Sequence, residues 1–372
     1  MMNCIREKRQ QRNLSREDLA KTVGVTRQTI GLIESGRVTP STHVALRLAH
    51  SLGCAVEELF WEDEIMDLPV ITSETPATEP LDVRRVYLAK VRNRVIARPA
   101  SPRQVVSFDS PAQGLLQTLN IADNNQGRVR LLQDESEVTT NVFVSGCDIG
   151  LGLWTHSFTK KSGKPMGTWF NVANRQALAE LSKGQTHIAA VHIASRAPQS
   201  SPLWPIFPRD HRVFCFADAE LGWAVKRGNP LGFSNAQDLT NGNLRIVNRE
   251  VGAGARDLLD QKLRQAGVSP AQVPGYFHEV QGHYEVADMV HKGIADVGMT
   301  HSGAAALYGL TFLPVQLEQC LLVVPEAYLS LPGIQDLMDT LSSDRFRSEL
   351  AAFAPYDVSR TGNVCPVILG YP

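Results

Sequence analysis

The sequence lacks the features that mark membrane, secreted and zinc-binding proteins. No apolar run reaches the roughly 18 residues that a membrane-spanning helix needs. The first residues, MMNCIREKRQQRN, carry charges with no apolar stretch behind them, so we expect no secretory signal and a cytoplasmic protein. The six cysteines are scattered, with no CxxC pair and no cysteine–histidine cluster. The sequence therefore predicts free thiols in a reducing compartment and no metal site.

Charge is unevenly distributed along a chain whose formal net charge is only −1. Residues 1–37 carry eight Lys and Arg against four Asp and Glu, whereas residues 61–80 carry six acidic residues and no Lys or Arg. A basic head followed by an acidic tether predicts a compact nucleic-acid-binding module joined to a part that avoids phosphates. With 372 residues, the chain is long enough for two or three domains.

Residues 1–61 have the pattern of five short helices. Ser15 is a good N-cap for the second helix, and Asp18, three residues on, resembles the partner in a capping box. Gly24 ends that helix, and Thr26 caps the next one. Two short helices joined by a tight turn inside a small bundle form a helix-turn-helix, whose second helix presents its N-terminal residues to the major groove of DNA.

The start of that second helix carries side chains suited to DNA. Arg27 suits guanine O6 and N7 or a phosphate, and Gln28 suits adenine N6 and N7. Arg16 and Arg37 would contact phosphates, which position a protein without specifying sequence. The predicted DNA-binding residues are Arg16, Thr26, Arg27, Gln28, Thr29 and Arg37.

The string LSREDLAKTVGVTRQTIGLIESGRVTPSTHVALRLAHSLGCAVEELF resembles the Xre-type helix-turn-helix of the lambda Cro and repressor class. The resemblance implies that Arg27 and Gln28 read bases, with Thr26 and Thr29 beside them. A helical bundle used for protein contact is the alternative. Because one such module binds weakly, we expect a homodimer or tetramer that reads a palindromic operator in double-stranded DNA.

The middle of the chain reads as a tether followed by a small β-rich connector. Residues 62–80 are acidic and contain three prolines, which predicts a linker. Alternation around Asn93 predicts a β-hairpin, and we expect residues 81–130 to form the connector. The predicted strands are a hairpin over 86–99 and single strands at 105–110 and 129–133. The connector's arginines, Arg92 and Arg98 among them, either touch DNA or form a solvated face.

Residues 131–372 alternate short apolar strands with helices, as an α/β domain does. Several strands end in Gly or small residues just before a helix, and the N–H groups at a helix N-terminus bind anions. Ligands in open α/β sheets lie at the carboxyl ends of strands. The turns with this pattern are Gly146-Cys147-Asp148, Val172-Ala173-Asn174, Gly252-Ala253-Gly254-Ala255 and Gly282-His283-Tyr284. Together they predict a site for an anion or a small polar molecule.

The strings VSGCDIGL, THIAAVHIAS, IVNREVGAGARDLLD, HYEVADMVHKGIADVGM, LLVVPE and FAPYDVSRTG resemble the type 2 periplasmic-binding-protein fold, close to the molybdate-binding-like domains fused to helix-turn-helix regulators. The resemblance implies two hinged lobes, 128–216 with 316–372 and 217–315, that close on a ligand. Ala253 and Ala255 stand where that family more often has hydroxyl residues. Arg175 and Arg256 lie nearby, and an arginine fork suits a carboxylate or phosphate, so an organic acid stands beside molybdate or tungstate as the expected effector.

Several of these residues also have a structural interpretation. Arg256 either binds an anion or pairs with Asp260 one helical turn on. Asp148 either holds a ligand or caps its own helix, and His192 either faces the ligand or is a hydrogen-bonded core histidine. Cys147 is either a sensor thiol or a packed one. The predicted ligand-binding residues are Gly146, Cys147, Asp148, Asn174, Arg175, His192, Gly252, Ala253, Gly254, Ala255, Arg256, His283, Tyr284 and Thr300.

The sequence contains none of the catalytic signatures HExxH, GxSxG or the cysteine-protease motif. The GAGAR turn lacks the GK[ST] of a phosphate-binding loop and is not a clean GxGxxG. We therefore predict no enzyme and no required cofactor, but a DNA-binding regulator with an all-α helix-turn-helix domain and a two-lobed α/β sensor of a small molecule. The alternatives are a repressor controlled by a protein partner, a transport binding protein, and an enzyme that uses the cleft.

Overall fold

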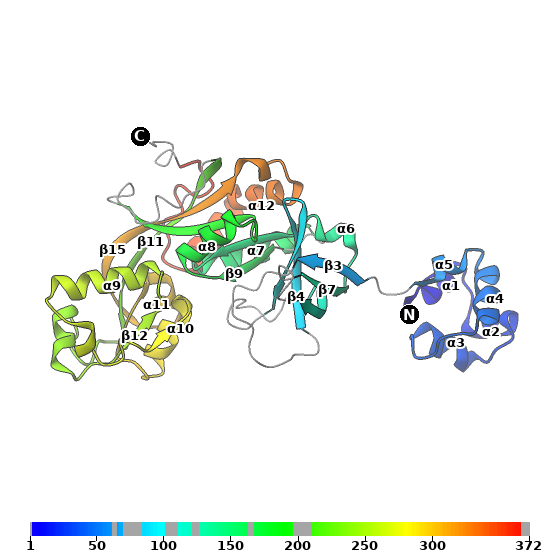
Figure 1. Ribbon diagram of the computed structural model, residues 1–372, viewed down its shortest axis with the longest axis horizontal. Helices are drawn as coiled ribbons and strands as arrows, with labels where there is room; N and C mark the ends of the chain where they lie inside the picture. Colours follow the sequence, from blue (N-terminus) through cyan, green and yellow to red (C-terminus); the bar gives the residue numbers. More distant parts are fainter. Residues whose placement is uncertain are drawn as a thin grey trace. The chain divides into compact units, whose positions relative to one another are not determined.

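The computed structural model describes residues 2–61, 65–69, 84–100, 111–120, 126–162, 167–195 and 210–365 (Figure 1). The chain divides into two compact units. The first unit comprises Met1–Asp67 with Arg128–Leu131, and the second comprises Leu68–Gly127 with Leu132–Pro372. The predicted linker over 62–80 and the predicted strand at 105–110 lie largely or wholly outside the described residues.

The first unit contains the five predicted helices. They are α1 (Ile5–Gln11), α2 (Arg16–Val23), α3 (Arg27–Glu34), α4 (Thr42–Leu52) and α5 (Val56–Leu59), and β1 (Met2–Asn3) pairs antiparallel with β2 (Phe60–Trp61). The Ser15 hydroxyl accepts from Asp18 N, and the Asp18 carboxylate accepts from Ser15 N, so the predicted capping box is confirmed. Gly24 ends α2 with a φ of 78°, a left-handed conformation that glycine adopts without strain.

One apolar stripe from each helix fills the core of this bundle. Leu19 on α2, Ile30 on α3 and Leu48 on α4 are fully buried. The buried carboxylate of Glu34 accepts from Arg9 Nε and Arg16 Nε, both at 2.7 Å. Burial alone would raise the pKa of Glu34, but these two hydrogen bonds outweigh burial and lower it. These two ion pairs of Glu34 fix the position of α3 against α1 and α2.

The connector region forms antiparallel strands. β4 (Arg84–Val91) pairs with β5 (Arg94–Pro99) in the predicted hairpin, and β4 also pairs with β6 (Gly114–Asn120). The other strands here are β3 (Ile65–Pro69) and β7 (Gln126–Leu131), of which β7 overlaps the predicted strand at 129–133. Tyr87 and Ile96 of the hairpin are buried in the same core as Phe143 and Phe170 of the α/β fold.

Arg98 contradicts the expectation that the connector's arginines face DNA or water. Its side chain is buried, and its two terminal nitrogens bind both carboxylate oxygens of Glu180 at 2.8 and 3.1 Å. Its guanidinium also lies 3.6 Å from the centre of the Phe170 ring and donates to Ser145 Oγ. Removing either charge of such a buried pair leaves the other unpaired, which is strongly destabilising. Arg98 therefore anchors the hairpin to the α/β fold.

The α/β fold is built on an eight-stranded sheet in the order β13-β12-β14-β11-β15-β10-β8-β9. Its two central strands, β11 (His211–Val225) and β15 (Thr311–Pro325), are long and antiparallel. One half of β15 pairs with β10 (Ile188–Ala194), and one half of β11 pairs with β14 (Val297–His301). The two long strands thus belong to both lobes (Figure 1). The lobe boundaries predicted at 216/217 and 315/316 fall within them.

Helices cover the sheet in each lobe. Lobe one contains β8 (Val142–Gly146), β9 (Gly167–Asn171), β10, α7 (Gly150–Ser162), α8 (Asn174–Ser182), α12 (Pro332–Ser342) and α13 (Asp344–Phe353). Lobe two contains β12 (Ile246–Arg249), β13 (Glu279–Val280), β14, α9 (Gly254–Gln265), α10 (Gly282–His291) and α11 (Ser302–Leu307). The short helices are α6 (Glu135–Val138), η3 (Ala236–Asn241), η4 (Pro270–Gln272) and η5 (Glu326–Tyr328). Each lobe has its own apolar core.

Candidate DNA-reading surface and inter-lobe site

The predicted DNA-binding residues gather on and around α3. Thr26, Arg27 and Gln28 are exposed at its N-terminus. The Thr26 hydroxyl accepts from Thr29 N at 3.0 Å and lies 2.8 Å from Thr29 Oγ1, so both threonines have a capping role besides any contact with DNA. Their roles at DNA, like those of Arg27 and Gln28, stay predictions.

The two predicted phosphate contacts differ in their surroundings. Arg16 uses its Nε to bind the buried Glu34 carboxylate, while its side chain stays 42% exposed. Arg37 is exposed beyond the end of α3. Arg16 therefore presents a guanidinium held in one orientation, whereas Arg37 presents one at the tip of a turn.

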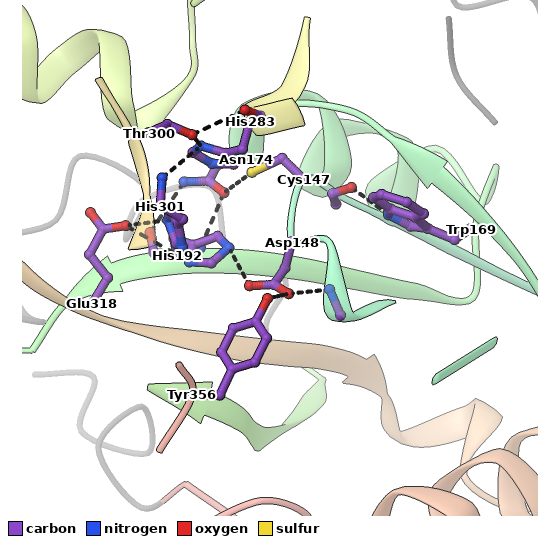
Figure 2. Close-up of polar contacts among 12 residues, drawn as sticks. Cys147, Asp148, Trp169, Asn174, His192, His283, Thr300, His301, Glu318 and Tyr356 are labelled. Atoms are coloured by element: carbon purple, nitrogen blue, oxygen red, sulfur yellow. Dashed lines mark hydrogen bonds and ion pairs between the residues drawn. The ribbon is translucent and has the colours of Figure 1, made fainter. Parts of the chain in front are cut away.

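In the second unit, the strand ends of the two lobes bring a polar cluster together (Figure 2). Asp148 follows β8 and His192 lies on β10, both in lobe one. His301 ends β14 in lobe two, and Glu318 lies on the shared strand β15. All four side chains are at least nine-tenths buried. We call Asp148, His192, His301 and Glu318 the inter-lobe cluster.

Asp148 uses only one of its carboxylate oxygens. Oδ1 accepts from the Gly150 amide and from the Tyr356 hydroxyl, both at 2.7 Å. Oδ2 has no hydrogen-bond partner among the described residues and lies 3.4 Å from His192 Nε2. Asp148 thus caps the start of α7 and also presents a free oxygen to the cluster. Burial raises its pKa to about 6, although both hydrogen bonds oppose the shift.

His192 is buried but not satisfied. Neither ring nitrogen makes a hydrogen bond within the described part of the chain, and Nδ1 lies 3.8 Å from Glu318 Oε2. Its backbone is held instead, because Asn174 Oδ1 accepts from His192 N at 3.1 Å and Asn174 Nδ2 donates to His192 O at 3.2 Å. The interpretation of His192 as a hydrogen-bonded core histidine is therefore wrong. Asn174 positions His192 and joins the start of α8 to β10.

Lobe two contributes two more histidines. His283 Nδ1 accepts from His301 N at 3.3 Å, and Thr300 Oγ1 donates to His283 O at 3.1 Å. His301 Nε2 lies 3.2 Å from Glu318 Oε2. The ring centres of His192 and His301 are 4.1 Å apart, and those of His283 and His301 are 4.3 Å apart. Three imidazoles, two of them from lobe two, therefore pack edge-on or tilted against one another at one interface.

Burial sets the charge state of these rings. It lowers the pKa of His192 and His283 well below the ordinary value and that of His301 to about 3. Burial also raises the pKa of Glu318. The rings are neutral near neutral pH, so each has one lone pair and one N–H group. The lone pair of His283 Nδ1 is already engaged by His301 N, whereas both ring nitrogens of His192 are available to a ligand.

The glycine turn of lobe two faces the start of α8 in lobe one. A Cβ placed on Gly252 would lie 3.6 Å from Arg175 Cδ, and one on Gly254 would lie 3.3 Å from Asn174 Nδ2. Gly252 has a φ of 93°, and Ala253 caps α9 without a side-chain hydrogen bond. The structure therefore brings the turn Gly252–Ala255 together with Asn174 and the exposed Arg175. Their binding roles stay predictions.

Arg256, in contrast, is engaged within lobe two. Its Nη1 binds Glu279 Oε1 at 2.8 Å and the Arg249 carbonyl at 2.9 Å, and its Nε lies 3.6 Å from Asp260 Oδ2. Its guanidinium also lies 4.5 Å from the centre of the Tyr276 ring. These contacts favour the interpretation of Arg256 as a structural residue.

The remaining predicted residues line the same region. Gly146 lies so close to Ala190 that a Cβ there would need the strand to shift. Burial raises the pKa of the Cys147 thiol to about 12, which fits a packed, inert thiol better than a sensor. Tyr284 of α10 packs against the core of lobe one, and burial raises its pKa to about 12.

Sequence reasoning missed Arg249, His301, Glu318 and Tyr356. Arg249 is 1% exposed, binds Glu250 through Nε and Nη2 at 2.7 and 2.8 Å, and leaves Nη1 without a partner in the residues the structure describes. Its position at the end of β12 and that of His301 at the end of β14 fit the strand-end rule that selected Thr300. Glu318 and Tyr356 give no such signal, because they reach the cluster only through the tertiary fold.

Comparison with known proteins places both units in families. Residues 156–342 match the family described as "PBP superfamily domain", and residues 5–59 match the family described as "Helix-turn-helix". The uncharacterised protein YvgK of Bacillus subtilis is 30% identical over 236 residues, which make up 62% of this chain and 75% of YvgK. An uncharacterised HTH-type transcriptional regulator of Methanothermobacter thermautotrophicus is 48% identical over 65 residues, 17% of this chain and 94% of that protein.

Among solved structures, an ABC-type phosphate transport receptor from Vibrio cholerae aligns with 58% of this chain and 99% of its own, at a TM-score of 0.41 and 13% identity. The chain belongs to the PBP superfamily and carries an N-terminal helix-turn-helix of the Xre type. It is a helix-turn-helix transcription regulator with a periplasmic-binding-protein-like domain. Within the described ranges, no helix combines the length and the apolar character that a membrane crossing requires.

Proposed function

We propose that this regulator is ligand-responsive: α3 reads an operator, and the interface between the lobes binds a small effector that changes operator affinity. The observation that carries the proposal is a set of buried polar atoms at facing strand ends with no hydrogen-bond partner in the described residues. They include Asp148 Oδ2, both His192 ring nitrogens and Arg249 Nη1. An unpaired buried polar group costs about 1–3 kcal/mol, so several at one interface are expected where a bound molecule completes them.

The effector that best fits this interface is a small anion, with molybdate, tungstate and an organic acid as the candidates. The N-terminus of α9 begins there, at Gly254, and brings N–H groups at the positive end of its dipole, whereas the Glu250 carboxylate already accepts from the Gly282 amide at the start of α10. The free Nη1 of Arg249 and the exposed Arg175 add donors of positive charge. No catalytic step is part of the proposal.

The effector could act as a switch because its contacts come from both lobes. Lobe one supplies Asp148 and His192, and lobe two supplies His301 and Arg249, so an effector that touches both sets stabilises the closed arrangement. A ligand shifts an equilibrium only by its difference in affinity for the two states. In a homodimer bound to a palindromic operator in the cytoplasm, closure would alter the spacing of the two recognition helices.

The test is thermal unfolding of the full chain with molybdate, tungstate, phosphate and small carboxylic acids. A compound that binds the native state and is present at a concentration of 100 times its Kd adds about 2.7 kcal/mol to the free energy of unfolding and raises Tm. We expect Arg249→Met to abolish the rise, while Arg245→Met, at an exposed Arg of the same lobe, retains it. If no compound raises Tm, control by a protein partner is favoured instead.

A further inference from the structure

The inter-lobe cluster has the composition of a transition-metal site. One ligand atom each from Asp148, His192 and His301 lies within 4.8 Å of the other two, and all three residues are buried. The 3.4 Å between His192 Nε2 and Asp148 Oδ2 is close to the separation of two donors on one tetrahedral Zn²⁺, which with bonds of about 2.0–2.1 Å is about 3.4 Å. Two imidazoles and a carboxylate suit Zn²⁺, Fe²⁺, Co²⁺ or Ni²⁺.

Direct contact between these side chains does not satisfy them. Asp148 is 1% exposed and His192 5% exposed, yet Asp148 Oδ2 and both His192 ring nitrogens make no hydrogen bond within the described ranges. His192 Nε2 points toward Asp148 Oδ2 (Figure 2). A cation that accepts a lone pair from each of these two atoms would satisfy both, and would leave the Nδ1–H of His192 directed at Glu318.

The charges in the cluster favour a divalent ion. Neither Asp148 nor Glu318 forms an ion pair with a Lys or Arg in the part of the chain that the structure describes; the titratable nitrogens beside them belong to histidines. Buried carboxylates are expected to be paired or to coordinate metals. Two carboxylates and one divalent ion would leave the buried cluster without net charge.

Glu318 has the geometry of a positioning residue. Its Oε2 lies 3.2 Å from His301 Nε2, and its Oε1 accepts from Gln316 Nε2 at 2.9 Å. A carboxylate that holds one ring nitrogen of a metal-binding histidine fixes the orientation of the ring and makes the other nitrogen a better ligand. Glu318 would therefore act on the metal through His301.

We propose that Asp148, His192 and His301 bind one divalent transition-metal ion between the lobes, with Glu318 orienting His301. This inference rests on the proposal that the inter-lobe interface is the effector site. Asp148 and His192 belong to lobe one and His301 to lobe two, so the ion joins the lobes and favours their closed arrangement. The metal ion is then either the effector or part of the site that receives the anion.

The test uses the untagged full chain, stripped with a chelator and dialysed against Zn²⁺ or Co²⁺. We expect one ion per chain and a visible Co²⁺ absorption spectrum of a nitrogen- and oxygen-liganded site. His192→Gln and His301→Gln should lose the ion, and Glu318→Gln should weaken binding by about 10–100-fold. His187→Gln is the matched control, because His187 is a buried histidine of the same unit whose two ring nitrogens are both hydrogen-bonded.

The inference is overturned if the wild-type chain binds no Zn²⁺ or Co²⁺ at one equivalent, a result that does not depend on how the variants fold. It is also overturned if His192→Gln, shown folded by circular dichroism, binds as the wild type does. Operator affinity measured in the same samples separates the two proposals. If an anion changes operator affinity but the chain binds no metal, only the metal site is refuted. If the chain binds a metal but no ligand changes operator affinity, only the switch is refuted.

Discussion

At the inter-lobe cluster, the burial that removes the histidines from water also keeps them uncharged. His192 and His301 have lowered pKa values, so their lone pairs are available at neutral pH without competition from protons. Both residues are positioned by their neighbours: Asn174 hydrogen-bonds the backbone of His192, and Glu318 Oε2 lies 3.2 Å from the His301 ring nitrogen Nε2. A site that is preorganised for a ligand differs from an ordinary core because its polar groups are held in place but lack hydrogen-bond partners.

At the DNA-reading surface, we propose that the exposed residues of α3 carry the sequence preference. Arg27→Ala or Gln28→Ala should cost about 1–3 kcal/mol at one operator position and relax specificity there, because each removes a bidentate contact to a base. Arg37→Ala should weaken binding to all sequences alike and reduce the salt slope by about one. Fluorescence anisotropy with cognate and mismatched duplexes at several salt concentrations measures both. Equal losses on all duplexes for Arg27→Ala would remove it from the base-reading residues.

His187 makes a separate prediction about pH. Its Nδ1 accepts from Phe143 N at 3.1 Å and its Nε2 lies 3.0 Å from the Lys90 carbonyl, an arrangement that only the neutral ring satisfies. Burial lowers its pKa to about 4, although the hydrogen bond to Lys90 opposes the shift. Since the unfolded value is about 6.5, the stabilisation is complete above that pH and is lost as the pH falls toward 4.

The test is urea unfolding of wild type and His187→Gln between pH 7.5 and 5. Between pH 7.5 and 5, the free energy of unfolding of the wild type should fall by about 2 kcal/mol more than that of the variant. The reason is that His187 takes up a proton in the unfolded chain but stays neutral in the folded chain. His156→Gln, at an exposed histidine, should follow the wild type. If the free energies of unfolding of the wild type and His187→Gln change equally with pH, the pKa of His187 is not lowered in the folded protein.

At the scale of elements, local signals predicted most of the fold. The capping box at Ser15, the left-handed Gly24 and the apolar strands that end in small residues each act over a few residues, so the helix-turn-helix and the α/β alternation could be read directly. β15 begins at Thr311, well before the apolar string LLVVPE at its end. Its first half has mixed polar and apolar residues, because there it pairs along lobe two and loses the burial pattern of a central strand.

The candidate site was partly predictable for the same reason. Asp148, His192 and Thr300 were found because they stand at strand ends, where the backbone pattern is visible in sequence. The approach of His301 to Asp148 joins residues far apart in the chain, and no spacing rule reports it. The sequence prediction of no metal site rested on local ligand spacing, which cannot detect such a cluster.

The capping box of α2 allows an element-scale test. Ser15→Ala should destabilise α2 by about 1 kcal/mol, because Asp18 N loses its side-chain acceptor and Asp18 Oδ2 loses the hydrogen bond from the Ser15 hydroxyl. Hydrogen exchange measured by mass spectrometry should be about fivefold faster over Arg16–Val23. Ser15→Thr, which keeps the hydroxyl, should exchange nearly as slowly as the wild type. The same acceleration in both variants would show that the hydroxyl does not stabilise the helix.

At the scale of the whole molecule, the chain divides into two compact units, to which we assign two tasks, operator binding and effector binding. A single helix-turn-helix makes few base contacts, so we expect the chain to act as a homodimer or tetramer on a two-fold operator. Size-exclusion chromatography with light scattering measures the mass in solution. A strict monomer at micromolar concentration, with and without DNA, would contradict this expectation.

Whether a ligand of the inter-lobe site changes operator binding is tested by measuring the affinity of the full chain for its selected operator, with and without that ligand at saturation. The ligand is whichever of molybdate, tungstate, an organic acid or Zn²⁺ raises Tm. We predict a change in operator Kd of at least about fivefold, corresponding to a coupling free energy of about 1 kcal/mol or more, and we expect Arg249→Met or His192→Gln to remove this change. An operator Kd that stays the same at saturating ligand would contradict it.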